Sequence, residues 1–200
     1  MKILNLYAGI GGNRKNWGDK HEITAVEYKQ EIADIYKDLY PKDKVIVGDA
    51  HEYLLNHYKE FDFIWSSPPC PTHSDIRRCG VHAGQYDALY PDMTLYQEII
   101  LLKHFARKDG FWVVENVKPY YKPLIEGKLI QRHLFWSNFE IEDYTKKDTR
   151  VQPISGKNGI SGKSTVYGFN LDEYKIEDKR KLLRNLVNPE LANHIFKNIC

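Results

Sequence analysis

The sequence contains few cysteines: only Cys70, Cys79 and Cys200 occur in 200 residues. An odd number of thiols makes a poor disulfide framework of the kind that stabilises small secreted domains. Chains without such a framework are typical of reducing compartments. We therefore expect an intracellular, cytoplasmic protein.

Long hydrophobic runs are absent as well. No stretch approaches the about 20 apolar residues that a membrane-spanning helix requires, so no membrane partner is expected. The initial stretch MKILNLYAGIGG is too short and too rich in glycine for a secretory signal.

Neither sign of charge is in large excess, because 29 Lys and Arg stand against 27 Asp and Glu and leave a net charge of +2. Such a chain has no strong overall field, so contacts to nucleic acid have to come from local patches. Hydrophobic residues form 42 % and charged residues 28 % of the chain, as in folded proteins. A length of 200 residues is enough for one domain with a substantial core.

Short β-rich runs alternate with helical segments through the first part of the chain. Strands are predicted at 2–7, 23–27, 45–47, 61–65 and 111–114, and helices at 31–39, 54–58 and 95–105. This alternation indicates an α/β fold with a doubly wound, mostly parallel sheet and helices on both faces.

The rest of the chain has a different pattern. The proline-rich stretch 67–91 shows no apolar periodicity. Further strands are predicted at 129–136 and 139–144, and 178–198 is predicted to be helical at both ends with a break at Asn188-Pro189.

Residues that can bind a ligand or react follow five of the predicted strands. They are Gly9–Gly12, Glu27, Asp49, Cys70 and Glu115. The carboxyl ends of parallel strands meet at one edge of a sheet, where ligands bind in folds of this kind. A core strand needs none of these residues, so their joint occurrence predicts a functional site at that edge.

The turn Tyr7–Gly12 has the composition of a nucleotide-binding loop, since glycines let the backbone approach a ligand closely. Glu27 follows at a spacing of about 20 residues, where a carboxylate accepts from ribose hydroxyls. With Asp49 after the next strand, the pattern favours a nucleoside site over a plain glycine turn. A phosphate-binding loop at Gly162–Ser164 is excluded, because Lys157 stands where its first glycine is required.

Cys70 follows two prolines at the end of a predicted buried strand. A thiol must reach the thiolate form to act as a nucleophile, and the rigid corner would aim it at the cofactor edge. Two alternatives remain. A buried cysteine can serve as a small apolar residue, and Cys70 with His73, Cys79 and His82 forms a C-x-x-H pair of motifs that could hold zinc.

Glu115 follows the strongly apolar run Phe-Trp-Val-Val. A carboxyl group in such surroundings tends to have a raised pKa and can donate a proton. The alternative is a helix cap or a surface acid.

Taken in order, these motifs resemble those of the cytosine-C5 DNA methyltransferases. Tyr7–Gly12 is similar to the family's first motif, Ser67–Cys70 to its nucleophile motif and Glu115–Val117 to its Glu-Asn-Val motif. Gln131-Arg132 resembles the Gln-x-Arg-x-Arg stretch, and Arg184–Pro189 resembles the late Gly-Asn-Ala-Val-Pro-Pro motif.

The resemblance implies a Rossmann-like class I methyltransferase fold and S-adenosylmethionine as the cofactor. Cys70, Glu115 and Arg132 fall on the catalytic positions. The residues that fall on cofactor-binding positions are Tyr7, Gly9, Gly11, Gly12, Glu27, Tyr28, Asp49 and Asn185. No metal is implied.

The chain departs from the family pattern at several positions. Tyr7 replaces the usual Phe, Pro71 the usual Gln, and His73 the Phe of a Phe-Ser pair. His133 or Phe135 stands where another arginine is expected.

The resemblance also predicts the division of the chain. Residues 1–139 would form the catalytic and cofactor-binding domain, 140–176 a very small target-recognition insert, and 177–200 a helical segment that packs back on the first domain. Within the insert, 145–166 is basic and could contact phosphates, although a solvated linker is the other interpretation. Its basic residues are Lys146, Lys147, Arg150, Lys157 and Lys163.

The activity that the resemblance implies is methyl transfer to C5 of cytosine in duplex DNA. Cys70 would add to C6 while Glu115 bonds N3, and the target base would be flipped out of the stack. The tRNA-acting relatives share the cysteine and the Glu-Asn-Val motif, so RNA is the first alternative substrate. An inactive fold that only binds nucleic acid is the second, although the presence of both Cys70 and Glu115 argues against it.

Overall fold

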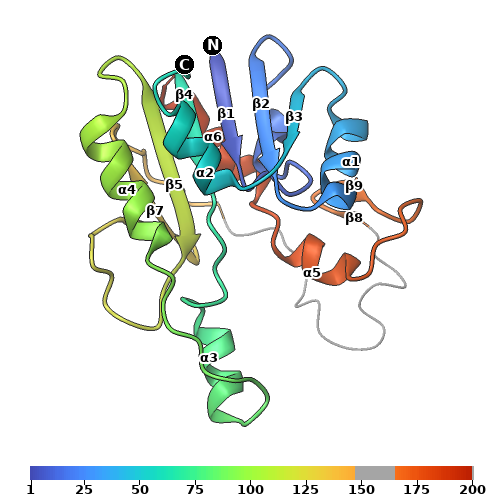
Figure 1. The fold of residues 1–200 in the computed structure, drawn as a ribbon, viewed down its shortest axis with the longest axis vertical. Coiled ribbons are helices and arrows are strands. Elements are labelled where there is room, and N and C mark those ends of the chain that lie inside the picture. The colour runs from blue at the N-terminus through green and yellow to red at the C-terminus, as the bar shows by residue number, and fades with distance from the viewer. Residues whose placement is uncertain (147–164, 200) are drawn as a thin grey trace.

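The computed structural model of the protein describes residues 1–146 and 165–199 (Figure 1). Its main feature is a seven-stranded sheet in the order β3-β2-β1-β4-β5-β7-β6. The strands are β1 (Lys2–Leu6), β2 (Glu22–Glu27), β3 (Lys44–Val47), β4 (Phe63–Ser66), β5 (Phe111–Val117), β6 (Lys128–Ile130) and β7 (His133–Ser137). The first five are parallel to one another, and β7 lies antiparallel between β5 and β6.

The helices are the short η1 (Asn13–Asn16), α1 (Gln30–Leu39), α2 (Ala50–His57), α3 (Asp75–His82), α4 (Thr94–Phe105), α5 (Lys179–Arg184) and α6 (Pro189–Lys197). Helices cover both faces of the sheet, whereas α3 and α5 lie below its lower edge (Figure 1). A separate two-stranded pair joins β8 (Thr165–Val166) to β9 (Phe169–Asn170). Among the described residues, no helix has the length and apolar character needed to span a membrane.

Alternate residues of the central strands explain the two layers of helices. Leu4 and Ile64 pack against α2 and α4 in one hydrophobic cluster. Their neighbours Ile3 and Trp65 belong to a second cluster with Trp17, which directly follows η1, and with α6. Successive side chains of a strand point to opposite faces, so strands that are apolar throughout need helices on both sides. The predicted doubly wound, Rossmann-like fold is confirmed.

Two local expectations were wrong, and one helix was not predicted. The proline-rich stretch 67–91 contains α3, whose residues are mostly exposed, so the apolar stripe that would reveal a helix is missing. The single strand predicted at 129–136 is a hairpin of β6 and β7, because Gln131 takes a left-handed φ of 55° and turns the chain. The described residues 139–144 form no strand.

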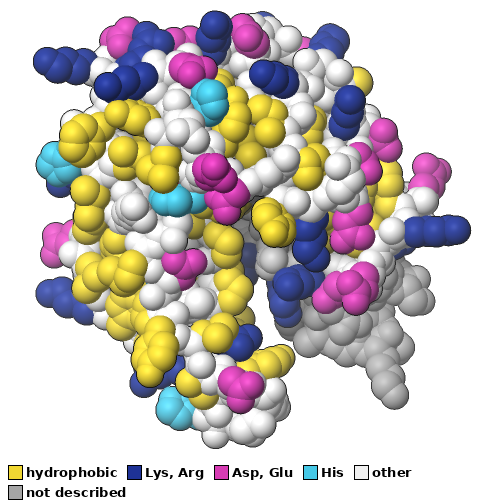
Figure 2. All heavy atoms as spheres, in the orientation of Figure 1, with side chains coloured by type: hydrophobic (Ala, Val, Ile, Leu, Met, Phe, Trp, Pro, Cys, Tyr) yellow, Lys and Arg dark blue, Asp and Glu magenta, His cyan; other side chains and the backbone are white. Residues whose placement is uncertain are grey.

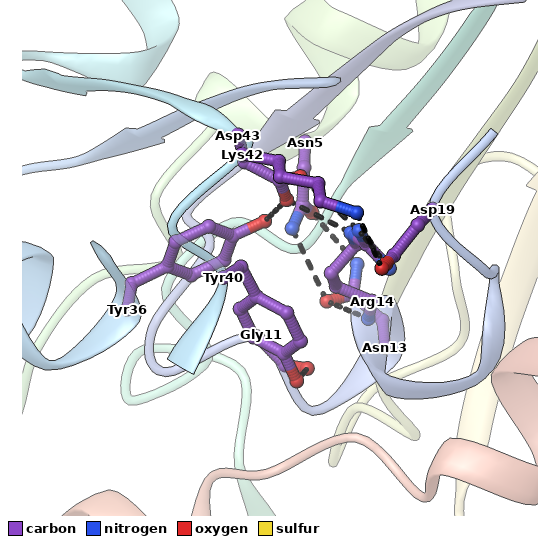
Figure 3. A network of polar contacts seen from close by, with 9 residues as sticks. All are labelled: Asn5, Gly11, Asn13, Arg14, Asp19, Tyr36, Tyr40, Lys42 and Asp43. Atoms are coloured by element: carbon purple, nitrogen blue, oxygen red, sulfur yellow. Dashed lines mark hydrogen bonds and ion pairs between the residues drawn. The ribbon is translucent and has the colours of Figure 1, made fainter. Parts of the chain in front are cut away.

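The glycine-rich turn after β1 is supported by a buried polar network (Figure 3). The guanidinium of Arg14 in η1 donates to both carboxylate oxygens of Asp43, at 2.8 and 3.1 Å. The Tyr36 hydroxyl donates to the same carboxylate at 2.9 Å, and the Tyr40 hydroxyl donates to the carbonyl of Gly11, also at 2.9 Å. The network therefore joins η1, α1 and the segment before β3 beneath the turn.

Removal of the Asp43 carboxylate should destabilise the fold strongly, because Arg14 is only 2 % exposed and would lose its buried counter-charge, keeping only the contact with the exposed Asp19 at 3.3 Å. We expect Asp43→Ala to lower the free energy of unfolding by about 3–5 kcal/mol, measured by urea denaturation. The matched control is Asp109→Ala, which breaks an exposed ion pair with Arg107 and should leave the midpoint unchanged. Equal effects of the two substitutions would contradict this role of the network.

Candidate active site

The carboxyl ends of the five parallel strands form one edge of the sheet, the lower edge in Figure 1. The predicted strand-end residues Gly9–Gly12, Asp49 and Cys70 follow β1, β3 and β4 along that edge, and Glu27 is the last residue of β2. Glu115 lies inside β5 rather than after it, since the strand continues to Val117. It still reaches the same edge, because its neighbour Val114 is paired with Ser66, the last residue of β4.

Glu27 and the glycine-rich turn are already joined. The amide of Gly9 donates to Glu27 Oε2 at 2.9 Å, and the amide of Lys29 donates to Oε1 at 3.0 Å. A carboxylate has about four acceptor positions, so each oxygen keeps one for a ribose hydroxyl. A Cβ built on Gly9 would meet nothing within 4 Å, which leaves open space beside the turn. Both observations fit a bound nucleoside.

Tyr28 and Asp49 follow the neighbouring strands β2 and β3. The ring of Tyr28 is 74 % exposed, so its face is available for stacking on an adenine. Asp49 is exposed at the start of α2, where Oδ1 accepts from the amide of Glu52 at 2.9 Å. An aromatic face and an acidic acceptor at adjoining strand ends fit the base of S-adenosylmethionine.

The late motif lies against the same turn. A Cβ on Gly12 would stand 2.9 Å from the carbonyl oxygen of Val187 and 3.0 Å from Leu186, so only glycine allows this approach. Asn185 is exposed at the carboxyl end of α5, directly before these two residues. The structure therefore places Asn185 beside the turn, although the two are far apart in sequence.

The loop that carries Cys70 is held on both sides. Before the cysteine, the carbonyl of Pro68 accepts from Asn116 Nδ2 at 2.9 Å. After it, the carbonyl of Cys70 accepts from the amides of His73 and Ser74 at 3.0 and 3.1 Å. The Pro-Pro corner is thus bonded to β5 and continued by a tight turn, and the half-buried thiol is fixed between them.

Opposing charges act on the Cys70 thiol. Burial raises its pKa most, and the Glu115 carboxylate raises it further, whereas the guanidinium groups of Arg132 and Arg184 lower it. The net direction is upward, so the thiol form predominates at neutral pH. Stabilisation of the thiolate during reaction would therefore depend on the two arginines.

Glu115 is 6 % exposed and lies 3.5 Å from His133, measured between Oε1 and Nε2. His133 starts β7 after the Gln131-Arg132 turn, which is where the family pattern led us to expect an arginine. Arg132 itself is exposed in that turn. The structure therefore places His133 beside Glu115, and the Arg132 guanidinium lowers the pKa of Cys70.

The four residues of the alternative zinc motif do not gather in this structure. Cys79 is exposed on α3, while His73 is buried and its Nδ1 lies 2.6 Å from the Tyr121 hydroxyl. Across the residues that the structure describes, no group of three or more His, Cys, Asp or Glu is arranged to hold a metal ion.

Two residues of this region were not predicted as site residues. Arg184 begins the late motif, but its effect on the pKa of Cys70 follows only from the structure. Glu98 is fully buried on α4, and spacing alone cannot distinguish an inward-facing acid on an amphipathic helix from a surface one. His133 could have been found from its position in the Gln-x-Arg-x-Arg stretch.

The fold and these residues define the class of protein. A parallel sheet continued by an antiparallel β7, with a glycine-rich turn after β1 and an acid at the end of β2, is the arrangement of S-adenosylmethionine-dependent methyltransferases. The cofactor is S-adenosylmethionine. Residues 1–123 match the family model for C-5 cytosine-specific DNA methylase, and the chain belongs to that family. This match supports cytosine methylation as its activity.

Several solved structures are similar to this chain at low sequence identity. They include a hypothetical protein of Thermus thermophilus (17 % identity, TM-score 0.47, covering 68 % of this chain and 73 % of that one). A methyltransferase of Agrobacterium tumefaciens has 12 % identity and a TM-score of 0.41, covering 60 % and 40 %. A DNMT2 mutant of Spodoptera frugiperda has 24 % identity and a TM-score of 0.39, covering 58 % and 35 %. Among curated proteins, none matches.

The charges around Cys70 predict a shift in its reactivity with pH. Glu115→Gln removes a negative charge, so the pKa of the thiol should fall and the midpoint of its alkylation profile should move to lower pH. Arg132→Ala should move the midpoint to higher pH. The measurement is the rate of iodoacetamide labelling, resolved by peptide mass spectrometry, with exposed Cys79 as an internal reference. Shifts of the same sign in both variants would contradict the opposite effects that we assign to Glu115 and Arg132 on the pKa of Cys70.

Proposed function

We propose that this protein transfers a methyl group from S-adenosylmethionine to C5 of cytosine in DNA, through a covalent bond between Cys70 and C6 of the base. The observation that supports it most is the meeting of three groups at one sheet edge. These are the Cys70 thiol, the buried Glu115 carboxyl and the glycine-rich turn, whose Gly9 amide donates to Glu27.

The reaction begins at Cys70. Its thiolate attacks C6, the S–C6 bond forms, and the electrons of the C5–C6 double bond become available at C5. Protonated Glu115 bonds N3 and so stabilises the negative charge that develops on the ring. When bound, S-adenosylmethionine would supply an electrophilic methyl group to C5, with cleavage of its sulfonium S–CH3 bond and release of S-adenosylhomocysteine. A base then removes the C5 proton, the S–C6 bond breaks, and the thiolate is restored.

The neighbouring cations have a defined part in this scheme. Arg132 and Arg184 favour the thiolate, which is the form that attacks and the form that leaves. His133, beside Glu115, is placed to hold that carboxyl in orientation. Arg132 was expected among the catalytic residues, and the field that it exerts on Cys70 gives it a specific role.

A surface that suits nucleic acid lies beside Cys70. Hydrophobic side chains gather on the lobe that carries α3 (Figure 2), and the exposed ones there include Ile76, Tyr86 and Tyr90. Arg77 lies over the ring of Tyr86 at 5.1 Å. Exposed aromatic rings with arginines stack on bases and attract phosphates. The lobe follows Cys70 directly in the chain, which favours contact with the nucleic acid that carries the target base.

The family description favours DNA over the alternative substrate RNA, and a target cytosine in a duplex has to be flipped out to reach Cys70. The division at 1–139, 140–176 and 177–200 stays a prediction. Of the basic segment 145–166, Lys146 is exposed beside Glu190. Lys147, Arg150, Lys157 and Lys163 lie outside the described residues, as does Cys200.

The covalent step can be tested by trapping. DNA that carries 5-fluorocytosine should form a stable adduct with the wild-type protein, because fluorine cannot leave C5 as a proton does. Cys70→Ala should abolish both the adduct and methyl transfer, whereas Cys79→Ala should retain most of both, since Cys79 is exposed on α3. Mass spectrometry of the adduct should place the base on Cys70.

Four results would contradict this scheme. An adduct on Cys79 would identify Cys79, rather than Cys70, as the nucleophile. Methyl transfer by Cys70→Ala would remove the covalent step. Adducts with 5-fluorocytosine in RNA but not in DNA would favour the alternative substrate, and an absence of adducts and transfer with both would favour a binding module.

Glu115→Gln should slow methyl transfer by about 100- to 10,000-fold, because an amide cannot give a proton to N3. Binding of S-adenosylhomocysteine, measured by calorimetry, should stay within about twofold of the wild-type value, since Glu115 lies on the base side of the site. Near-normal turnover in this variant would assign the acid role to another group.

A further inference from the structure

A fully buried carboxylate joins three of the strand-end segments. Glu98 on α4 has an exposure of 0 % and receives three short contacts. The Tyr7 hydroxyl donates to Oε1 at 2.6 Å, the Ser66 hydroxyl donates to Oε2 at 2.6 Å, and His51 Nδ1 lies 3.1 Å from Oε1. Charge-assisted bonds of this length are among the strongest that side chains make.

The first contact reaches the cofactor turn. Tyr7 is the first residue after β1 and takes a left-handed φ of 55°, which is unfavourable for an aromatic residue. Burial and the bond to Glu98 raise the pKa of its hydroxyl, so it stays a donor at every relevant pH. The bond therefore fixes an otherwise strained residue two positions before Gly9.

The second contact reaches the nucleophile loop. Ser66 is the last residue of β4 and is fully buried, four positions before Cys70. The next residue, Ser67, accepts a hydrogen bond from the indole of Trp65 at 2.9 Å, and the prolines follow. The backbone between Ser66 and the thiol has little conformational freedom, so a displacement of Ser66 would also displace Cys70.

The third contact supplies the counter-charge. His51 lies in the first turn of α2, two residues after Asp49, and its side chain is 20 % exposed. The hydrogen bond with Glu98 raises the pKa of His51 above its ordinary value, which favours the imidazolium form. A buried carboxylate needs such a partner, because without one its charge is costly.

We propose that Glu98 is a positioning residue that sets the cofactor turn, through Tyr7, and the nucleophile loop, through Ser66, at a fixed distance from each other. The inference rests on the proposed function, because that distance matters only if Cys70 and the cofactor act on the same base. Methyl transfer requires the sulfur, the base and the methyl donor to be aligned within a narrow range.

Glu98→Gln tests the contacts with Tyr7 and with Ser66 together, and the test needs no nucleic acid. The amide has the same shape but loses the charge, and one of its two ends becomes a donor. We expect S-adenosylhomocysteine to bind about 5- to 50-fold more weakly by calorimetry. We also expect iodoacetamide to label Cys70 about three- to tenfold faster, because the loop is released. Neither readout depends on methyl transfer, so both stay valid if the proposed function fails.

Variants that remove only one of the two hydrogen bonds to Glu98 distinguish a positioning role from a general effect on stability. Tyr7→Phe should weaken S-adenosylhomocysteine binding and leave the rate of Cys70 labelling within about twofold. Ser66→Ala should speed Cys70 labelling and leave S-adenosylhomocysteine binding within about twofold. These variants keep the test valid if Glu98→Gln does not fold. A purely structural acid would change both readouts together in every variant.

The chain offers a matched control on α2. His57 Nδ1 lies 2.8 Å from Glu60 Oε1, so this pair has the same chemistry as His51 with Glu98, but it is exposed. Glu60→Gln should change neither readout. The proposal is overturned if folded Glu98→Gln behaves like Glu60→Gln, or if Tyr7→Phe and Ser66→Ala each alter both readouts equally.

Discussion

The site depends on the register in which β1 pairs with its two neighbours. Leu6 is opposite both Val26 in β2 and Ser66 in β4, so the residues that follow these three lie at the same level of the sheet edge. Parallel strands in register present their next residues side by side at one edge. Tyr7, Glu27 and the start of the Cys70 loop are brought together by backbone pairing alone. The hydrophobic clusters on both faces of the sheet maintain that pairing.

Side-chain bonds then convert this approximate placement into a defined geometry. Glu27 bonds the amide of Gly9, and Asn116 bonds the carbonyl of Pro68. Each joins neighbouring segments, which a sheet edge alone would leave free to move. Glu98 adds a connection between the cofactor side and the nucleophile side. The Glu115 carboxylate raises the pKa of the half-buried Cys70 thiol and two arginines lower it, so charge as well as position is arranged at this edge.

Much of the fold and several site residues follow from local signals. The strands and the residues at their ends were predictable because buried parallel strands read as short apolar runs that stop at glycine or a polar residue. Helix α3 was not predictable, because it buries little beyond Gly80 and so has no apolar stripe. The turn at Gln131 was missed because its left-handed φ occurs at a non-glycine residue. The role of Glu98 required the three-dimensional structure, since its partners lie 91, 47 and 32 residues away.

The central claim, that the chain methylates C5 of cytosine in DNA, is tested most directly by the product. The protein should be incubated with S-adenosylmethionine that carries a trideuterated methyl group and with DNA and RNA of matched sequence. Each nucleic acid is then digested to nucleosides for mass spectrometry. The account predicts the label in 5-methyl-2′-deoxycytidine from the DNA. Label at the exocyclic amine, label in RNA alone, or no label in either would contradict it.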